Sequence, residues 1–327
     1  MPQDFRDLRI HPELIHGSFV ETIRQRVGLF NAASNNTFVM ASGSALGFSE
    51  EETFFEQVDT VGRLDETSDG DIGVNKITGS QWVKPHIFRW VALQGEELNL
   101  WLQGRRWDPE ALSLAMGEKF AKDTMKDRAN TSIRALLGAM LGESDMVLDA
   151  ADESPPGTIS HRRLNRVMQK LGDQRDEIGM LVMNSTTWAD LIDQSIVDDV
   201  YNVGGFTIRQ GVPLSLNIPV FVIDSPALTE TVSPGTDNHY ILALRPGAMV
   251  LTDLLVPTFD FDTDILKHNQ VMTIRGDLRY QLYPQGFSWD DGNNPNDAAL
   301  DNASNWDYQM DDVKSGPGVV LKVQETT

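Results

Sequence analysis

The chain has 327 residues, enough for one large domain or two modest ones, each with its own hydrophobic core. Lys and Arg number 27 against 48 Asp and Glu, a net charge of −21 that argues against a dedicated nucleic-acid binder and against an anionic membrane surface. Cysteine is absent, which excludes disulfides and thiolate chemistry. No apolar run approaches the ~18–20 residues of a membrane helix, and residues 1–20 lack the pattern of a signal peptide.

The N-terminal third predicts a short helix followed by a projecting hairpin. Apolar residues at helical spacing predict a short helix over residues 20–30, and the Asn-, Ser- and Gly-rich stretch 31–47 indicates an extended arm or loop. Strand-like segments at 52–58 and 81–93 flank the polar stretch 59–76. Long polar stretches of this kind are uncommon inside compact domains, so we expect a long β-hairpin that extends from the body.

The strongest helix signal begins at Asp108, a suitable N-cap, with Pro109 in the first turn. No proline interrupts the segment up to Leu141, and Gly142 is a suitable terminator. At 1.5 Å per residue this helix would extend roughly 50 Å, long enough to form the spine of the molecule. Its apolar positions recur at steps of about four residues: Leu112, Met116, Phe120, Met125, Ala129, Ile133, Leu137 and Met140.

The second half of the chain predicts a compact α/β module and then a long strand pair. Residues 149–157 have the composition of a linker, and Ser160 caps a helix that ends at Gly172. Alternation of apolar and polar residues over 258–283 predicts two long antiparallel strands, and 318–323 is a further apolar strand. The fold class is therefore α+β. The module's expected elements are strands at 178–183, 206–210, 218–223, 239–244 and 249–251, and a helix beginning at Asn184 or Ser185.

Catalytic signatures are absent from the sequence. There is no P-loop, dinucleotide-binding glycine turn, H-E-x-x-H or G-x-S-x-G motif, and the six histidines are not at metal-binding spacing. We therefore expect no catalytic, cofactor-binding or metal-binding residue, although a Ser/His/Asp site assembled from distant residues stays open. The acidic stretch 290–297 and the pair Asp69 and Asp71 carry oxygen ligands suited to Ca²⁺, but their spacing favours solvated turns.

Two further clusters have both a functional and a structural interpretation. One basic cluster either binds phosphate or forms the solvated face of an amphipathic helix, and the second use is commoner. The tryptophans either stack on a ligand or pack in a core or an interface, and again the second use is commoner. The basic cluster is Arg162, Arg163, Arg166 and Lys170, and the tryptophans are Trp82, Trp90, Trp101 and Trp107.

Extended elements with apolar stripes are too large to be covered within one subunit, so we expect oligomerisation. Three segments then carry a resemblance to a known family. Lys84 to Gly142 looks like the strand and spine helix of phage coat proteins, and Ile159 to Leu191 is similar to the opening of their axial domain. Gln285 to Val323 carries a G-x-x-W … NP … L … NW … K pattern like that of their closing segment. The chain thus resembles the major capsid protein of tailed phages, with the Hong Kong 97-type fold.

The resemblance implies a peripheral domain built on the spine helix and long strands, an axial α/β domain and an extended β-hairpin loop that lies over a neighbouring subunit. The implied boundaries are 1–33 for an N-terminal arm and short helix, 34–93 for the extended loop, 94–154 for the peripheral domain with the spine helix, 155–255 for the axial domain, and 256–327 for the return strands and C-terminal tail. Candidate inter-subunit residues in the loop are Leu64, Asp69, Asp71, Ile72, Val74 and Lys76.

The implied function is self-assembly into pentamers and hexamers of an icosahedral head around double-stranded DNA, without enzymatic activity or cofactor. The implied partners are further copies of the chain, a separate scaffolding protein, a portal, a decoration protein, and DNA held without sequence-specific contact, but no membrane. The implied location is the virion, assembled in the host cytoplasm. Because the chain is acidic, basic residues gathered on the inner face would reduce its repulsion of DNA; the candidates are Arg105, Arg106, Lys119, Lys122, Lys126, Arg128 and Arg134.

Two alternative functions stay open at this stage. One is the shell of a cellular nanocompartment with the same fold, which a cargo-binding site on the inner wall would distinguish. The other is a soluble hydrolase whose site is dispersed over 155–283, which turnover by a monomer would favour. Some capsid proteins of this fold cross-link a loop lysine to an asparagine of a neighbouring subunit. For Lys76 and Lys84 of this chain, the sequence shows no carboxylate and asparagine that can be assigned to such a cross-link.

Overall fold

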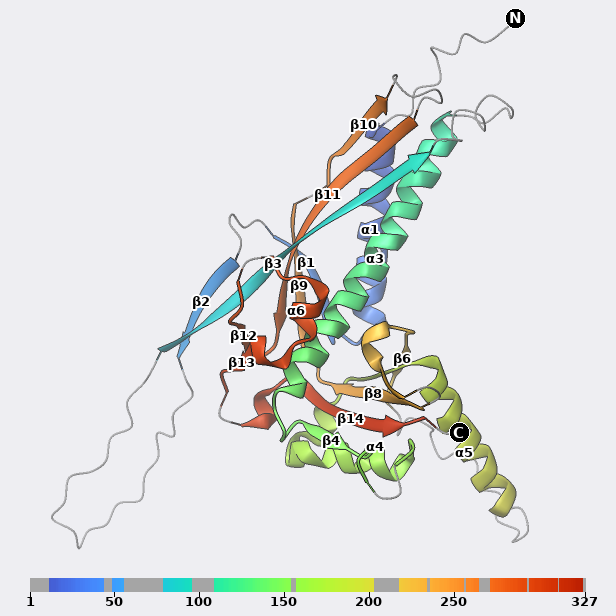
Figure 1. Ribbon diagram of the computed structural model, residues 1–327, viewed down its shortest axis with the longest axis vertical. Helices are drawn as coiled ribbons and strands as arrows, with labels where there is room; N and C mark the ends of the chain where they lie inside the picture. Colours follow the sequence, from blue (N-terminus) through green and yellow to red (C-terminus); the bar gives the residue numbers. More distant parts are fainter. Residues whose placement is uncertain are drawn as a thin grey trace, which may run out of the picture.

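The computed structural model describes residues 12–43, 49–55, 79–95, 109–153, 157–202, 218–233, 236–255, 257–264, 271–292, 294–310 and 312–325. In this part of the chain two six-stranded sheets lie at different levels of an elongated molecule (Figure 1). Among the described residues, no helix has the length and apolarity needed to cross a membrane. The expected strand at 206–210 lies outside the described residues.

The first sheet contains the longest strands. Its members are β1 (Phe38–Ser42), β2 (Ser49–Phe55), β3 (Gly79–Gly95), β9 (Met249–Leu255), β10 (Phe259–Asp264) and β11 (Val271–Pro284). The order across the sheet is β1-β9-β11-β3-β2, with β10 also paired to β11. β3 changes partner along its length, because residues 79–85 pair with β2 and residues 86–95 pair with β11.

Two long helices, α1 (Pro12–Ala33) and α3 (Pro109–Leu141), pack side by side against one face of this sheet (Figure 1). They approach closely at Gly117, where a Cβ atom would lie 2.5 Å from the carbonyl oxygen of Ile15. Only glycine permits that approach. The shared core consists of Ile15, Phe19, Ile23, Met116, Phe120, Ala121, Phe259, Ile274 and Leu278.

The second sheet has shorter strands; one of its faces joins α3 and the first sheet in a common apolar core, and a separate apolar cluster covers its other face. Its members are β4 (Val147–Asp149), β5 (Met180–Met183), β6 (Val220–Val222), β7 (Thr229–Ser233), β8 (Thr236–Leu244) and β14 (Gly318–Gln324). The order is β4-β14-β8-β5-β6, with β7 on β8. The helices of this region are α4 (His161–Met168), the 3₁₀ segments η2 (Gln169–Glu177) and η4 (Pro226–Leu228), and α5 (Ser185–Asn202).

A hook of residues 287–308 joins the C-terminal half of α3 to the first sheet. It contains β12 (Phe287–Trp289), α6 (Asp297–Asp301), η5 (Ala303–Asn305) and β13 (Trp306–Tyr308), and η6 (Val313–Ser315) follows it. The rings of Trp289 and Trp306 meet edge to face, with their centres 4.7 Å apart. At Gly138 of α3 a Cβ atom would lie 2.2 Å from the carbonyl oxygen of Leu300, so the hook and the helix are in backbone contact.

Several expected elements are confirmed. α3 spans the predicted spine, and its predicted apolar positions are buried apart from the half-buried Leu112 and Met125. β10 and β11 form the expected antiparallel pair. Ser160 caps α4, because its side chain accepts a hydrogen bond from the backbone N–H of Arg163. The strand pair β2 and β3 matches the two arms of the predicted hairpin.

Other expectations differ from the structure. α1 begins at Pro12 instead of residue 20, because its first turns contribute Ile15 and Phe19 to the core shared with α3. Residues 86–93 were expected in a projecting loop, but they pair with β11 inside the first sheet. β9, expected in the axial module, pairs with β1 and β11, and β14, expected in the peripheral return, pairs with β8. Each sheet is therefore completed by a strand from across the expected boundary at residue 255.

Candidate interaction surfaces

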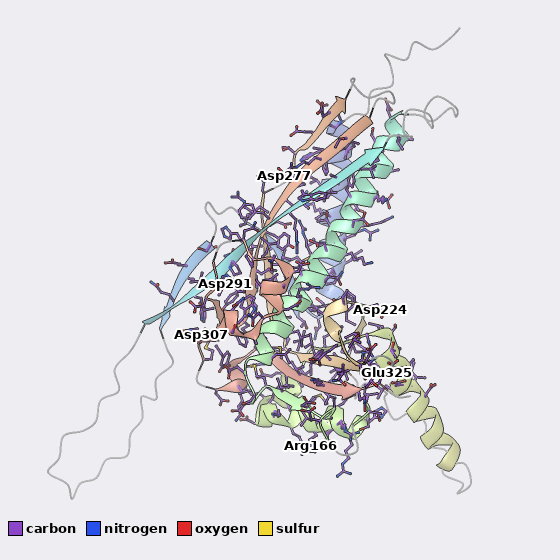
Figure 2. All side chains as sticks on the ribbon, in the orientation of Figure 1. Arg166, Asp224, Asp277, Asp291, Asp307 and Glu325 are labelled. Atoms are coloured by element: carbon purple, nitrogen blue, oxygen red, sulfur yellow. The ribbon has the colours of Figure 1, made fainter. Side chains whose placement is uncertain are left out.

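The face of the first sheet opposite the helices carries large side chains that the described residues do not cover. Along β11, Ile274 and Leu278 point into the core with α1 and α3, so the alternate residues Arg275, Asp277 and Arg279 point the other way. Asp277, labelled in Figure 2, marks this part of the sheet. We call Phe88, Trp90, Leu255, Arg275 and Arg279 the outer sheet face.

The outer sheet face combines apolar and cationic groups. Trp90 is 68% exposed and Leu255 is 51% exposed, both large values for apolar side chains. The guanidinium of Arg279 lies 4.2 Å from the ring centre of Phe88, while Arg275 Nε contacts Asp277 Oδ1 at 2.8 Å. Together these residues line a groove of about 490 Å³. Exposed aromatic and arginine side chains in one patch are typical of protein–protein interfaces.

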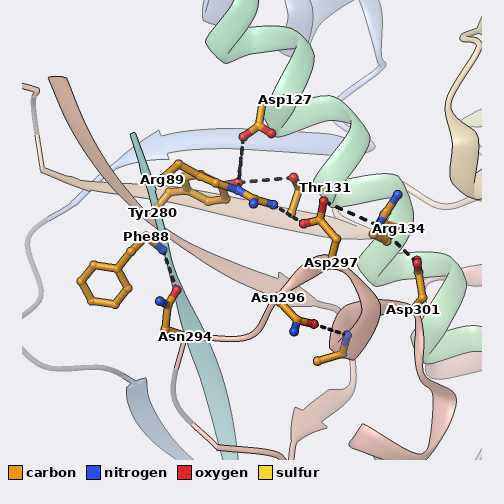
Figure 3. Close-up of polar contacts among 11 residues, drawn as sticks. Phe88, Arg89, Asp127, Thr131, Arg134, Tyr280, Asn294, Asn296, Asp297 and Asp301 are labelled. Atoms are coloured by element: carbon orange, nitrogen blue, oxygen red, sulfur yellow. Dashed lines mark hydrogen bonds and ion pairs between the residues drawn. The ribbon is translucent and has the colours of Figure 1, made fainter. Parts of the chain in front are cut away.

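A network of polar side chains behind this face ties three separate segments together (Figure 3). Arg89 of β3 forms ion pairs with Asp297 of the hook and with Asp127 of α3, the latter at 3.7 Å. Arg134 of α3 contacts Asp301 Oδ2 at 3.3 Å and Asp297 Oδ2 at 3.6 Å. The network thus fastens the hook to both the helix and the long strand.

Tyr280 of β11 adds a fourth segment to this network. Its hydroxyl donates to Asp127 Oδ2 at 3.2 Å and lies 3.4 Å from Thr131 Oγ1. Burial raises the pKa of Tyr280 to about 12, so the phenol stays neutral. Burial also raises the pKa of Asp127, and this effect outweighs the attraction of Arg89. These groups are engaged with one another, an arrangement that stabilises the fold.

A loop contact at the middle of β3 completes the groove. The side-chain oxygen of Asn294 accepts a hydrogen bond from the backbone N–H of Phe88 at 3.0 Å, beyond the point where β2 stops pairing with β3 (Figure 3). Asn294 has φ +51°, a left-handed conformation that asparagine tolerates better than most residues. Asn296 caps α6 by accepting from the N–H of Ala299. The described part of the acidic stretch 290–297 therefore ends at the N-cap and first residue of a helix.

The basic residues expected on an inner face divide into two groups. Lys119, Lys122 and Lys126 are exposed on α3, and Lys122 forms a 2.6 Å ion pair with Glu118 one turn away. Arg128 and Arg134 instead point into the molecule beside carboxylates of the same chain, so neither lies on an exposed surface that packaged DNA could contact. Arg105 and Arg106 lie outside the described residues, as do the six loop candidates Leu64, Asp69, Asp71, Ile72, Val74 and Lys76.

The remaining candidates from the sequence form local contacts. In the basic cluster Arg163 contacts Glu153 at 2.9 Å, and Lys170 donates to the carbonyl oxygens of Ser144 and Asp145. Arg166 extends away from the body (Figure 2). No group of three or more potential ligands arranged for a metal ion occurs among the described residues.

Sequence reasoning named Trp90 as a core or interface residue but missed the rest of the outer sheet face. The signal was present in the alternation of β11: Arg275, Asp277 and Arg279 occupy the positions that alternate with buried residues, so they had to share one exposed face. Their neighbours Phe88 and Leu255 became identifiable only through the register, which pairs both of them with Arg279.

Comparison with known proteins places this architecture in a family. The sequence profile of the Gp13-like family, described as major capsid protein 13-like, matches residues 7–320. No curated protein matches the chain. The structure is similar to the capsid of Ralstonia phage GP4, with TM-score 0.54, 8% identity, and coverage of 90% of this chain and 88% of that one.

Two further phage structures show the same fold. The cyanophage Pam1 capsid gives TM-score 0.53 at 11% identity and covers 88% of each chain. Mycobacterium phage Cain gives TM-score 0.53 at 12% identity and covers 89% of each chain. The α+β class and the Hong Kong 97-type resemblance are thereby confirmed for the fold as a whole. The chain belongs to the Gp13-like major capsid protein family.

Proposed function

We propose that the chain forms pentamers and hexamers of an icosahedral phage head that encloses double-stranded DNA, and that the outer sheet face is a contact between copies. The observation that supports the contact is the exposure of Trp90 and Leu255 beside Arg275 and Arg279 on a sheet whose other face packs against α1 and α3. Such a face would lose its apolar exposure to water on assembly. The acidic surface of a second copy would supply charges that complement the arginines.

The geometry favours a head-to-tail contact. The outer sheet face carries two arginines, one of them paired with Asp277, while exposed carboxylates such as Glu51 of β2 lie elsewhere on the same sheet. When one patch of each copy contacts a different patch of the next copy, the copies form a ring if the rotation between neighbours divides a full turn evenly. Fivefold and sixfold assemblies form in this way. Many weak contacts of this kind then stabilise a closed shell by mass action.

The test of the contact is Trp90→Ser combined with Leu255→Ser, with Trp90→Phe as the matched control. Because both side chains are mainly exposed, the unfolding free energy should change by no more than about 0.5 kcal/mol. Loss of a hot spot worth about 2 kcal/mol should raise the concentration needed for assembly about 30-fold, measured by mass photometry. Assembly of the double variant at the wild-type concentration would contradict the proposed contact.

We also propose that the exposed lysines of α3 face the packaged DNA. A chain of net charge −21 repels DNA, and a row of Lys119, Lys122 and Lys126 on one helix would reduce that repulsion locally. Changing all three to Glu should shorten the packaged genome or increase DNA leakage from particles. Unchanged packaging would remove this assignment, and the same three positions changed to Gln separate loss of charge from its reversal.

The finer elements of the proposal concern the loop and the partners. We infer that the segment containing Leu64, Asp69, Asp71, Ile72, Val74 and Lys76 contacts a neighbouring subunit, so that deletion of 64–74 leaves a folded chain that fails to form mature shells. A separate scaffolding protein, a portal and a decoration protein are the expected partners, the host cytoplasm is the expected place of assembly, and enzymatic activity is not expected. Normal particles from the deletion would refute the role of the loop.

A further inference from the structure

A cavity of about 580 Å³ lies between α1 and the parallel pair of β1 and β9. Phe19, Ile23 and Val27 of α1 form one apolar wall, and Met40 and Leu254 contribute to the others. This volume is in the range of cavities that hold small organic molecules. The charged residues that line this cavity are not members of the outer sheet face.

The polar part of the wall is Arg128 of α3, which is only 2% exposed and is the largest fully buried side chain in the described part of the chain. Its Nη2 lies 2.7 Å from Asp253 Oδ1, but Nε and Nη1 have no acceptor among the described residues. A guanidinium presents five N–H donors in a planar fork that matches a carboxylate, and buried donors without acceptors are destabilising. Asp253 alone leaves most of this fork unused.

The charges around the cavity indicate which kind of ligand fits. Exposed Arg24 of α1 also lines it, so two arginines face one aspartate. Burial raises the pKa of Asp253, an effect that outweighs the attraction of Arg128. The cavity is therefore locally cationic in a strongly acidic chain. The apolar walls disfavour a strongly hydrated inorganic anion and favour an anion with an apolar body.

We propose that this cavity binds a carboxylate on an apolar body, with the carboxylate on Arg128 beside Asp253 and the body against α1. Both nitrogens of Arg128 that have no acceptor are covered from solvent, so binding of the ligand requires the guanidinium to rotate toward the cavity. The carboxylate comes from a free organic acid or from an Asp or Glu side chain of another copy, because the two present the same chemistry.

The test uses the unassembled full-length chain and isothermal titration with 4-phenylbutyrate and its neutral amide, 4-phenylbutyramide. The acid should bind at least tenfold more tightly than the amide. Ser42→Phe fills the cavity from its exposed rim on β1 without altering Arg128, and it should weaken binding of the acid at least tenfold. Ser233→Phe, at an exposed serine of β7 in the other sheet, is the matched control and should bind as wild type does.

Three results would overturn the proposal: no binding of the acid, equal binding of acid and amide, or undiminished binding by Ser42→Phe. Titration of assembled particles then identifies the source of the carboxylate. Exclusion of 4-phenylbutyrate from particles supports occupation by a side chain of another copy, and retained binding supports a free acid. Arg128→Lys, which keeps the charge but loses the planar fork, should weaken binding of the acid in both samples.

Discussion

The contact between α3 and the hook depends on a single missing side chain. At Gly138 an added Cβ would lie 2.2 Å from the carbonyl oxygen of Leu300 and 3.1 Å from the carbonyl carbon of Asp301. Both neighbours are backbone atoms, so they cannot rotate away as a flexible side chain would. We therefore expect Gly138→Ala to push the hook away from the helix.

The expected cost follows from two opposing effects. Overpacking costs ~1–3 kcal/mol, and a backbone clash this close belongs at the upper end, about 3 kcal/mol. Alanine within a helix gains about 1 kcal/mol over glycine, which leaves a net destabilisation of about 2 kcal/mol. Gly28 of α1 is the matched control, because a Cβ there meets no atom within 4 Å. Gly28→Ala should stabilise the chain by about 1 kcal/mol.

Urea unfolding followed by tryptophan fluorescence measures both variants. The indole N–H of Trp306 donates to the same Leu300 carbonyl oxygen at 3.1 Å, so displacement of the hook should also change the native fluorescence of Gly138→Ala. The unfolding free energies of the two variants should differ by about 3 kcal/mol, because Gly138→Ala loses about 2 kcal/mol and Gly28→Ala gains about 1 kcal/mol. A Gly138→Ala protein as stable as the wild type, with unchanged fluorescence, would refute the close-contact argument.

Three further predictions concern individual side chains. Tyr280→Phe removes the hydroxyl that donates to Asp127 at 3.2 Å, and it should lower the unfolding free energy by about 1 kcal/mol. Burial raises the pKa of Tyr280 to about 12, so the wild type should also lose more stability than the variant as the pH rises from 10 through 12. An equal urea midpoint and equal alkaline slopes would contradict this. The pKa of Asp127 is raised from 3.8 by burial, so its contribution to stability is present below pH 3.8 and is lost as the pH rises through the raised value. Asp127→Asn should therefore flatten the dependence of stability on pH above 3.8, and an unchanged slope would count against it. Ser160→Ala removes the cap of α4, where the hydroxyl accepts from the N–H of Arg163 at 3.3 Å, and should cost about 1 kcal/mol in a urea titration. No shift of the midpoint would show that the cap is dispensable.

Local patterns predicted the elements whose signal lies within one segment. The period of apolar residues along α3 and the alternation along β11 correspond to faces that are buried, so these elements were predictable. Arg128 was assigned to an exposed basic face, although Phe120, Thr124 and Arg128 follow one another at steps of four and share a buried stripe. The spacing was sufficient to place it inward, but its charge argued for the surface.

Pairing between distant segments was not predictable in the same way. β9 and β14 are apolar strands that would suit either sheet, and their partners are set by packing across residues far apart in the chain. The network of Arg89, Asp127 and Asp297 likewise joins three segments whose proximity no local pattern records. The outer sheet face needed the register of β3 against β11 before its members could be identified as neighbours.

Assembly of the purified chain tests the central claim most directly. Cryo-electron microscopy and mass photometry over a range of protein concentrations should show closed shells, or free pentamers and hexamers, with the outer sheet face covered at contacts between copies. A chain that stays a compact monomer at high concentration, with Trp90 still exposed to solvent, would contradict the account.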